Sequence, residues 1–192
     1  HETGLFTTKV TSALHETNLW LWQLINAAKD AGIYENTDFF IVSDHGQLNI
    51  RRAVALNALL AENGLIDVDE NGQIRDFTAF AKSGGLSACV YLKHPENEED
   101  RKRTDEVLKK LAESEVYGIS EVFTEEEART KHRLGGDFAF VVETDGYTTF
   151  SNEWKRPLIR SLDNHTYRFG RATHGHLPEK GPQPTLISFG PH

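Results

Sequence analysis

The stretch that decides the fold is Thr37-Asp38-Phe39-Phe40-Ile41-Val42-Ser43-Asp44-His45-Gly46. Its apolar run, residues 39–42, is aromatic and β-branched, which predicts a buried strand of a parallel sheet covered on both faces. The run ends in Asp44 and His45, and ligands bind at the carboxyl ends of strands in open α/β sheets. A carboxylate oxygen beside an imidazole nitrogen suits zinc or manganese. The alternative is a turn in which Asp44 caps the next element and His45 is merely exposed.

A second motif near the end of the chain favours the metal interpretation. His174 and Gly175 lie in a loop, Ala172–Pro178, that precedes an apolar run at Thr185–Phe189. A third polar group, His1-Glu2-Thr3-Gly4, stands directly before a long amphipathic segment. Three histidine-bearing loops beside strand or helix ends indicate a metal site.

The rest of the chain alternates between helix and strand signals. Helices are expected at 8–31, 53–62 and 96–114, and a capping box at Thr124–Glu127 predicts a further short helix. Strands are expected at 86–93 and in two hairpins, 65–68 with 73–77 and 137–144 with 147–150, the second around Asp145-Gly146. Because the signals of the middle differ from those around it, we expect an inserted α+β lobe at residues 65–165. It interrupts an α/β core made of residues 1–64 and 166–192.

Composition limits the classes of function. The chain has 192 residues, which is enough for a sizeable core, and a net charge of −8. An acidic surface argues against binding to a nucleic-acid polymer, whereas anionic small substrates stay compatible because bound metal ions dominate the local field. The single Cys89 excludes an internal disulfide. The sequence shows no stretch long and apolar enough to cross a membrane.

The ordered motifs resemble the type I phosphodiesterase/nucleotide pyrophosphatase family of the alkaline phosphatase superfamily. In that family an Asp-x-x-x-His element precedes a helix, a strand ends in Ser-Asp-His-Gly, and a late His-Gly precedes another strand. His1 matches the first element, Asp44 and His45 match the second, and His174 matches the third. The resemblance implies an alkaline-phosphatase-like three-layer core with a mostly parallel sheet, here incomplete and carrying the smaller α+β insertion.

The resemblance also implies a site. It would hold two divalent metal ions, zinc or alternatively manganese, with Asp44 and His45 at one ion and His1 and His174 at its neighbour. His174 is preferred to His176 as a ligand because the family's histidine directly precedes the glycine. His176 and Arg171 are candidates for supporting a ligand or contacting substrate, although a structural ion pair explains Arg171 equally well. No Ser or Thr matches the family's nucleophile, which is expected upstream of residue 1 together with another metal-binding Asp.

The implied activity is metal-dependent hydrolysis of phosphodiester or nucleotide pyrophosphate bonds in a small substrate. We expect the remainder of the catalytic domain to be the partner of this chain, the chain alone to be inactive, and the lobe to shape substrate choice. Another hydrolase of the superfamily, such as a phosphomonoesterase, phosphonate hydrolase or sulfatase, uses the same metal frame and is the close alternative. A non-catalytic, metal-stabilised binding domain is the alternative from a different class.

Overall fold

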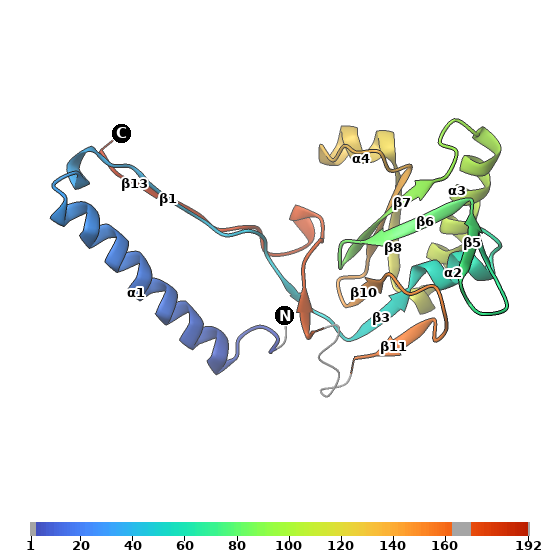
Figure 1. Cartoon of the computed structure of the whole chain (residues 1–192), viewed down its shortest axis with the longest axis horizontal. Helices are drawn as coiled ribbons and strands as arrows, with labels where there is room; N and C mark the ends of the chain where they lie inside the picture. The colour runs from blue at the N-terminus through green and yellow to red at the C-terminus, as the bar shows by residue number, and fades with distance from the viewer. Residues whose placement is uncertain (1–2, 163–169, 192) are drawn as a thin grey trace.

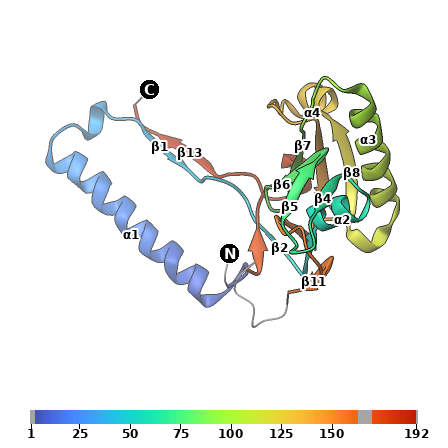
Figure 2. The same cartoon turned by 45° about the vertical axis from the view of Figure 1, so that its right-hand side comes forward.

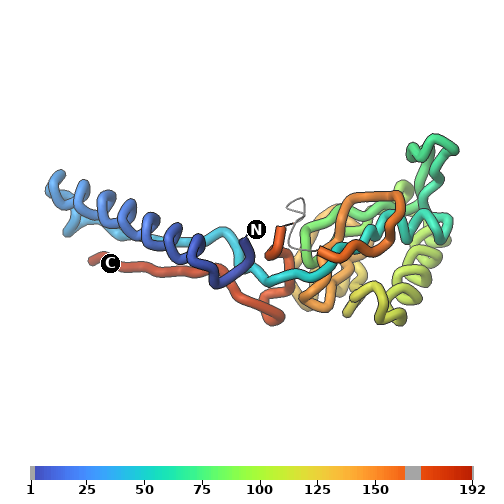
Figure 3. The backbone as a smooth tube through the Cα atoms, turned by 90° about the horizontal axis from the view of Figure 1, so that it is seen from below, coloured from blue at the N-terminus to red at the C-terminus, as the bar shows by residue number. Residues whose placement is uncertain are grey.

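The computed structural model describes residues 3–162 and 170–191, so the predicted ligand His1 lies outside the described residues. The chain consists of an arm and a lobe (Figure 1). The arm is formed by helix α1 (Thr8–Asp30) and by strands β1 (Phe39–Val42) and β13 (Leu186–Phe189). The view in Figure 2 shows the same separation, and Figure 3 shows from below that the arm extends away from the lobe.

Helix α1 forms where the sequence predicts it, but none of its residues is buried. Its first turn is capped by Thr7, whose hydroxyl accepts a hydrogen bond from the Val10 amide at 3.4 Å. A short 3-10 helix, Tyr34–Asn36, then turns the chain into β1. The arm therefore exposes large apolar side chains on both its helix and its strands, namely Leu14, Leu19, Trp20, Trp22, Leu24, Phe40, Val42, Leu186 and Ile187.

Strands β1 and β13 share one sheet, as expected, but they run antiparallel. Phe39 pairs with Phe189, and their rings stack with centroids 5.0 Å apart. The reason is topological, because β1 leads the chain into the lobe and β13 leads it out again. The expectation of a strand buried on both faces is also wrong for the described residues, since Phe40 and Val42 are exposed.

The sheets are mostly antiparallel, so the expected mostly parallel sheet is not confirmed. The lobe is built on a four-stranded antiparallel sheet with the order β6-β7-β9-β8. These strands are Ala79–Ser83, Ser87–Leu92, Phe140–Thr144 and Ile119–Thr124. A three-stranded sheet, β10-β3-β11, contains the one parallel pairing among the described residues, between β10 (Thr148–Ser151) and β3 (Arg52–Ala55), and is completed by β11 (Ile159–Ser161). Two small antiparallel pairs complete the set, β4 (Ile66–Val68) with β5 (Ile74–Phe77) and β2 (Leu48–Asn49) with β12 (Ala172–Thr173).

Both faces of the four-stranded sheet are covered. Helices α2 (Leu56–Glu62) and α3 (Glu98–Glu113) pack on the first face in the main core, which includes Leu59, Val90, Leu108, Phe140 and Val142. Helix α4 (Glu125–His132) covers the second face in a smaller cluster of Phe123, Ala128, Phe138, Val141 and Leu177. Val54, Leu56, Leu59 and Leu60 lie in the same core as residues of the expected 65–165 lobe. We therefore propose that the lobe begins near residue 52.

Two local predictions are wrong for the same reason, which is that pairing partners are distant in sequence. Residues 53–55 form a strand and not the start of a helix, because β3 lies between β10 and β11. Strands β9 and β10 do not form the hairpin predicted around Asp145, because β9 pairs with β7 and β8 while β10 pairs with β3.

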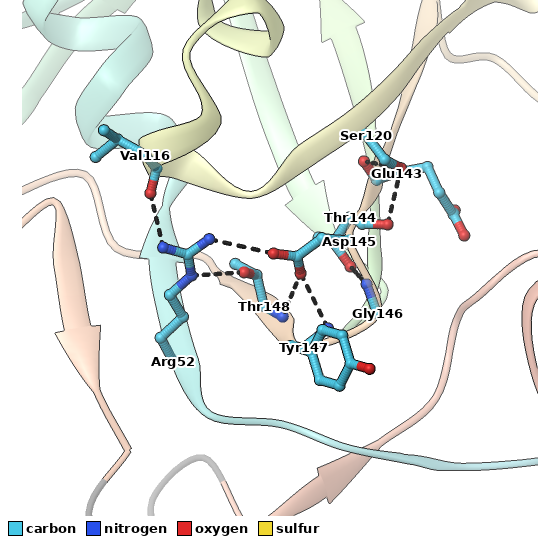
Figure 4. A network of polar contacts seen from close by, with 9 residues as sticks. All are labelled: Arg52, Val116, Ser120, Glu143, Thr144, Asp145, Gly146, Tyr147 and Thr148. Carbon is cyan, nitrogen blue, oxygen red and sulfur yellow. Dashed lines mark hydrogen bonds and ion pairs between the residues drawn. The ribbon is translucent and has the colours of Figure 1, made fainter.

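A polar network centred on Asp145 fixes the chain between β9 and β10 (Figure 4). Asp145 accepts hydrogen bonds from the Tyr147 and Thr148 amides at 2.9 and 2.8 Å, and it pairs with Arg52 of β3 at 3.1 Å. The Arg52 guanidinium also donates to Thr148 Oγ1 and to the Val116 carbonyl. Burial alone would raise the pKa of Asp145, but these hydrogen bonds lower it below its usual value.

Other local signals are confirmed. The β4–β5 hairpin forms across Asn71-Gly72. The capping box of α4 is complete, since the Thr124 hydroxyl accepts from the Glu127 amide and the Glu127 carboxylate accepts from the Thr124 amide. In the described part of the chain, no helix combines the length and apolar character needed to cross a membrane.

One buried side chain hydrogen-bonds to the free backbone edge of strand β6. Asn57, in the first turn of α2, is fully buried, and its amide donates to the Ala81 carbonyl at 2.8 Å. Its side-chain oxygen accepts from the Ala81 amide at 2.7 Å. Strand β6 is an edge strand, so Asn57 satisfies two backbone groups that α2 shields from water.

We predict that Asn57→Ala lowers the free energy of unfolding by about 3 kcal/mol, because two buried backbone groups lose their partners. Urea denaturation followed by circular dichroism measures the change. Asn71→Ala, at an exposed position of the β4–β5 turn, is the control and should cost less than about 0.5 kcal/mol. Equal costs for the two variants would contradict this role of Asn57.

Candidate metal centre

Asp44 and His45 lie in the segment between β1 and β2. The chain passes from the arm to the lobe after β1 (Figure 1). The β1–β2 segment is tied to the residues before β13, since the Ser43 amide donates to the Thr185 carbonyl at 3.0 Å and the Thr185 amide donates to Ser43 Oγ at 2.7 Å. The Asp44 side chain is 95% exposed, and its Oδ2 lies 3.5 Å from His45 Nε2. The His45 ring is about one third exposed, so both groups can reach a ligand from solvent.

His174 reaches the same place from the other end of the chain. It directly follows β12, which pairs with β2, and β2 follows the Asp44–His45 turn. The pairing of Thr173 with Leu48 therefore brings the two histidine-bearing loops together. The rings of His45 and His174 lie with centroids 4.1 Å apart and tilted by 31°.

The surroundings of His174 favour its neutral form. Burial is the largest cause that lowers its pKa, and the positive charge that His45 or His176 would carry lowers it further. Asp44 opposes the shift, but the net direction is downward. A neutral imidazole has the free lone pair that a metal ion requires, so the downward shift of the pKa favours the form of His174 that can act as a metal ligand.

The other predicted site residues lie near this pair to different extents. His176 Nε2 lies 3.1 Å from the Pro182 carbonyl oxygen, and its Nδ1 is buried without a hydrogen-bond partner among the described residues. Arg171 immediately precedes β12, and its carbonyl accepts a hydrogen bond from the Ile50 amide at 2.9 Å. His1 lies outside the described residues.

The donor set fits a divalent transition metal in its chemistry. One carboxylate and two imidazoles lie together, and this mixture suits zinc or manganese. Within residues 3–162 and 170–191, however, no group of three or more His, Cys, Asp or Glu side chains is placed so that it could hold one ion. Any ion here would need ligands beyond those that the described residues bring together.

Close backbone packing holds the loop that carries His174. We call residues 174–182 the histidine loop. Gly46 lies so close to the Pro182 carbonyl that a Cβ would overlap it. Gly175 has φ +89° and lies against the Gly84 carbonyl, and Gly85 has φ +99° and faces the His174 carbonyl. Gly85 and Gly175 are required both by left-handed backbone and by lack of space, and Gly46 by lack of space.

A functional candidate that the sequence did not reveal is Glu143 of β9. It is only 2% exposed, and its Oε1 accepts a hydrogen bond from the Leu177 amide of the histidine loop at 2.9 Å. Burial raises its pKa to about 7, although the Leu177 hydrogen bond opposes the shift. Its carboxyl group points away from the Arg52–Asp145 pair (Figure 4).

Glu143 faces a pocket of about 340 Å³ between the histidine loop and the lobe, lined also by Leu48, Ser120, Thr144, Asp145, Gly146, His176 and Lys180. The only sequence signal for Glu143 was a charged residue directly after the apolar run 138–142. Strand alternation allows such a residue to face solvent, so the signal does not distinguish burial from exposure.

The comparisons with known proteins agree with the motifs. The family model described as type I phosphodiesterase/nucleotide pyrophosphatase matches residues 1–176. Among solved structures, human ectonucleotide pyrophosphatase/phosphodiesterase 5 is similar with a TM-score of 0.65 at 15% identity. The murine protein of the same name gives 0.58 at 19% identity, and its inactive form in complex with AMP gives 0.59 at 18%. Each match covers 100% of this chain and 44% of the other chain. No curated protein matches the sequence.

We predict that the pKa of Glu143 makes stability depend on pH. The folded state binds the Glu143 proton more tightly than the unfolded state, so the contribution is fully present below pH 4.5 and is lost as pH rises through about 7. The loss should be roughly 3 kcal/mol in the free energy of unfolding. Glu143→Gln should remove this slope, whereas Glu70→Gln, at an exposed position, should retain it. Urea denaturation across this pH range measures both, and an unchanged slope in Glu143→Gln would show that another group titrates.

Proposed function

Because the chain belongs to the type I phosphodiesterase/nucleotide pyrophosphatase family, we propose that Asp44, His45 and His174 serve a two-metal centre that hydrolyses phosphodiester or nucleotide pyrophosphate bonds. The observation that carries the proposal is the contact between the His45 and His174 rings at 4.1 Å. These residues come from opposite ends of the chain and meet where the arm joins the lobe. A purely structural turn would not require two imidazoles and a carboxylate at this point.

We assign the ligands in two pairs. Asp44 and His45 serve one ion, and His174 serves its neighbour together with His1. This division is compatible with the described residues. They bring two imidazoles and a carboxylate near one another, but not in an arrangement in which all three could hold the same ion. When bound, two divalent ions supply Lewis acidity at the attacking and leaving oxygens of the phosphate. Zinc is the preferred ion and manganese the alternative.

The residues of the chain orient the site and hold its charges. Asp44 contributes a carboxylate beside His45, which partly offsets the charge of a bound cation. The lowered pKa of His174 supports its role as a neutral donor. His176, on the same loop, lines the pocket that Glu143 faces, which supports the proposal that it contacts a substrate or supports His174. A small phosphodiester or nucleotide is the proposed substrate class.

The arm is where we propose that the remainder of the catalytic domain packs. The chain spans 44% of the length of the solved structures it resembles. The arm exposes an apolar surface that includes Trp20, Trp22, Phe40 and Leu186. Exposed apolar patches of this kind mark sites of interaction with other protein segments. Adjacent segments of a complete domain would cover it and would supply the nucleophile and the missing metal ligands. The lobe, on this proposal, also shapes substrate choice.

A protein that joins this chain to the preceding part of its catalytic domain tests the proposal. We predict that it hydrolyses bis-nitrophenyl phosphate in the presence of zinc and that His174→Ala lowers the rate by more than about 100-fold. His94→Ala is the matched control, because His94 lies at the surface of the lobe in an ion pair with Glu96. It should retain the rate of the unaltered protein.

The substrate profile separates the alternatives. A preference for nitrophenyl phosphate or nitrophenyl sulfate would indicate another hydrolase of the superfamily. Stoichiometric metal without hydrolysis of any of the three reporters would indicate a metal-stabilised binding domain.

We predict that the 192-residue chain alone is inactive and holds less than one zinc ion. Two protein ligands per ion leave it largely hydrated, with much lower affinity than a site with three or four ligands. Atomic absorption after gel filtration measures the metal, and the same reporter measures the rate. Turnover by the chain alone that is abolished by His174→Ala would show that a nucleophile lies within it.

A further inference from the structure

The histidine loop packs on the second face of the four-stranded sheet through one apolar side chain. Leu177, three residues after His174, is 8% exposed. It lies in the smaller apolar cluster with Phe123, Ala128, Phe138 and Val141, which come from β8, α4, the segment before β9 and β9 itself. The loop is therefore anchored in a cluster that the lobe supplies.

Glu143 adds a directional contact to this apolar anchor. It lies two residues after Val141 on β9, so the two side chains share a face of the sheet. Its carboxylate accepts the buried Leu177 amide hydrogen bond at 2.9 Å. A buried carboxylate costs desolvation energy, and in the described structure its partner is the backbone of the histidine loop.

A second contact fixes the beginning of the loop. The Leu86 amide donates to the His174 carbonyl at 2.8 Å, and Gly85, which lacks a Cβ, allows that carbonyl to lie this close to the lobe. Ion pairs between Lys180 and Glu121 and between His132 and Glu179 are partly exposed and hold the later part of the loop, beyond Leu177. The backbone from His174 to Leu177 is thus held at both ends by the lobe.

His45, by contrast, is held by the arm. It follows β1, and its turn is bound to the segment that leads into β13. The β2–β12 pair joins the segments that carry His45 and His174. The spacing between the two rings therefore depends on this pair and on how firmly the histidine loop is fixed to the lobe. A side chain that fixes the loop acts on the metal centre without touching it.

We propose that Glu143 and Leu177 are positioning residues that fix His174 relative to His45, so that the lobe supports one half of the metal centre in addition to shaping substrate choice. The importance of the position of His174 for metal binding rests on the proposed function. The geometric part stands on the contacts alone, which allows the two to be tested separately.

Three variants of the 192-residue chain test the geometric part. Glu143→Leu removes the acceptor, Glu143→Gln keeps an amide oxygen for the Leu177 N–H, and Leu177→Ala removes the apolar anchor. Leu134→Ala, 41% exposed and outside the smaller cluster, is the matched control. The readouts by NMR are hydrogen exchange at the Leu177 and Leu86 amides and the nuclear Overhauser effect between the His45 and His174 rings.

We expect Glu143→Leu and Leu177→Ala to speed exchange at the Leu177 amide by at least about tenfold and to weaken the ring-to-ring effect. Glu143→Gln and Leu134→Ala should resemble the unaltered chain. Exchange at the Val90 and Val142 amides, in the middle of the sheet, shows that the lobe stays folded. A folded Glu143→Leu chain with an unchanged Leu177 amide and an unchanged ring-to-ring effect would overturn the proposal.

Manganese ions alone test the consequence for metal binding, because paramagnetic broadening detects weak association. In the unaltered chain Mn²⁺ should broaden the His45 and His174 ring signals together. In Glu143→Leu the broadening of His174 should need several times more Mn²⁺, while that of His45 stays constant, and Glu143→Gln should restore His174. Equal broadening of His174 in all variants would overturn the link to the metal. Broadening of neither histidine in the unaltered chain would overturn the link to the metal and leave the geometric result to stand by itself, whereas the reporter assay on the longer protein tests the proposed function.

Discussion

The arrangement of the site depends on one topological constraint, which is that β1 enters the lobe and β13 leaves it as an antiparallel pair. The inner ends of these strands must then lie side by side. One inner end carries Asp44 and His45, and the other continues from the histidine loop that begins at His174. The contact between the two imidazole rings follows from this pairing and from the short β2–β12 pair beside it.

The lobe contributes more than a neighbouring surface. Its four-stranded sheet is buried on both faces, and the second face is completed by Leu177 of the histidine loop. Glu143 stays buried at the cost of desolvation and accepts the Leu177 hydrogen bond. A salt-bridged surface contact would be weaker and more easily exchanged with water, whereas this combination of apolar packing and a buried hydrogen bond has one geometry.

In the arm, residues whose pattern predicts burial are exposed. Helix α1 has the periodicity of a core helix but no buried residue among those described, and β1 has the composition of a central strand but exposes Phe40 and Val42. Sequence and burial disagree here because amphipathic patterns state which face should be covered and not what covers it. The disagreement is the physical basis for proposing that another part of the catalytic domain packs on the arm.

The sequence by itself determined the features that depend on residues close together in the chain. The extent of α1, the hairpin of β4 and β5, the capping box at Thr124–Glu127 and the candidate ligands Asp44, His45 and His174 depend on neighbouring residues or short motifs. The tertiary structure decided the rest, because strand direction and pairing depend on distant segments that compete for the same backbone hydrogen bonds. It made β1 antiparallel to β13, turned residues 53–55 into a strand and separated β9 from β10. It also placed Glu143 against the histidine loop, where burial, which no local pattern specifies, leaves its carboxylate to accept the Leu177 hydrogen bond.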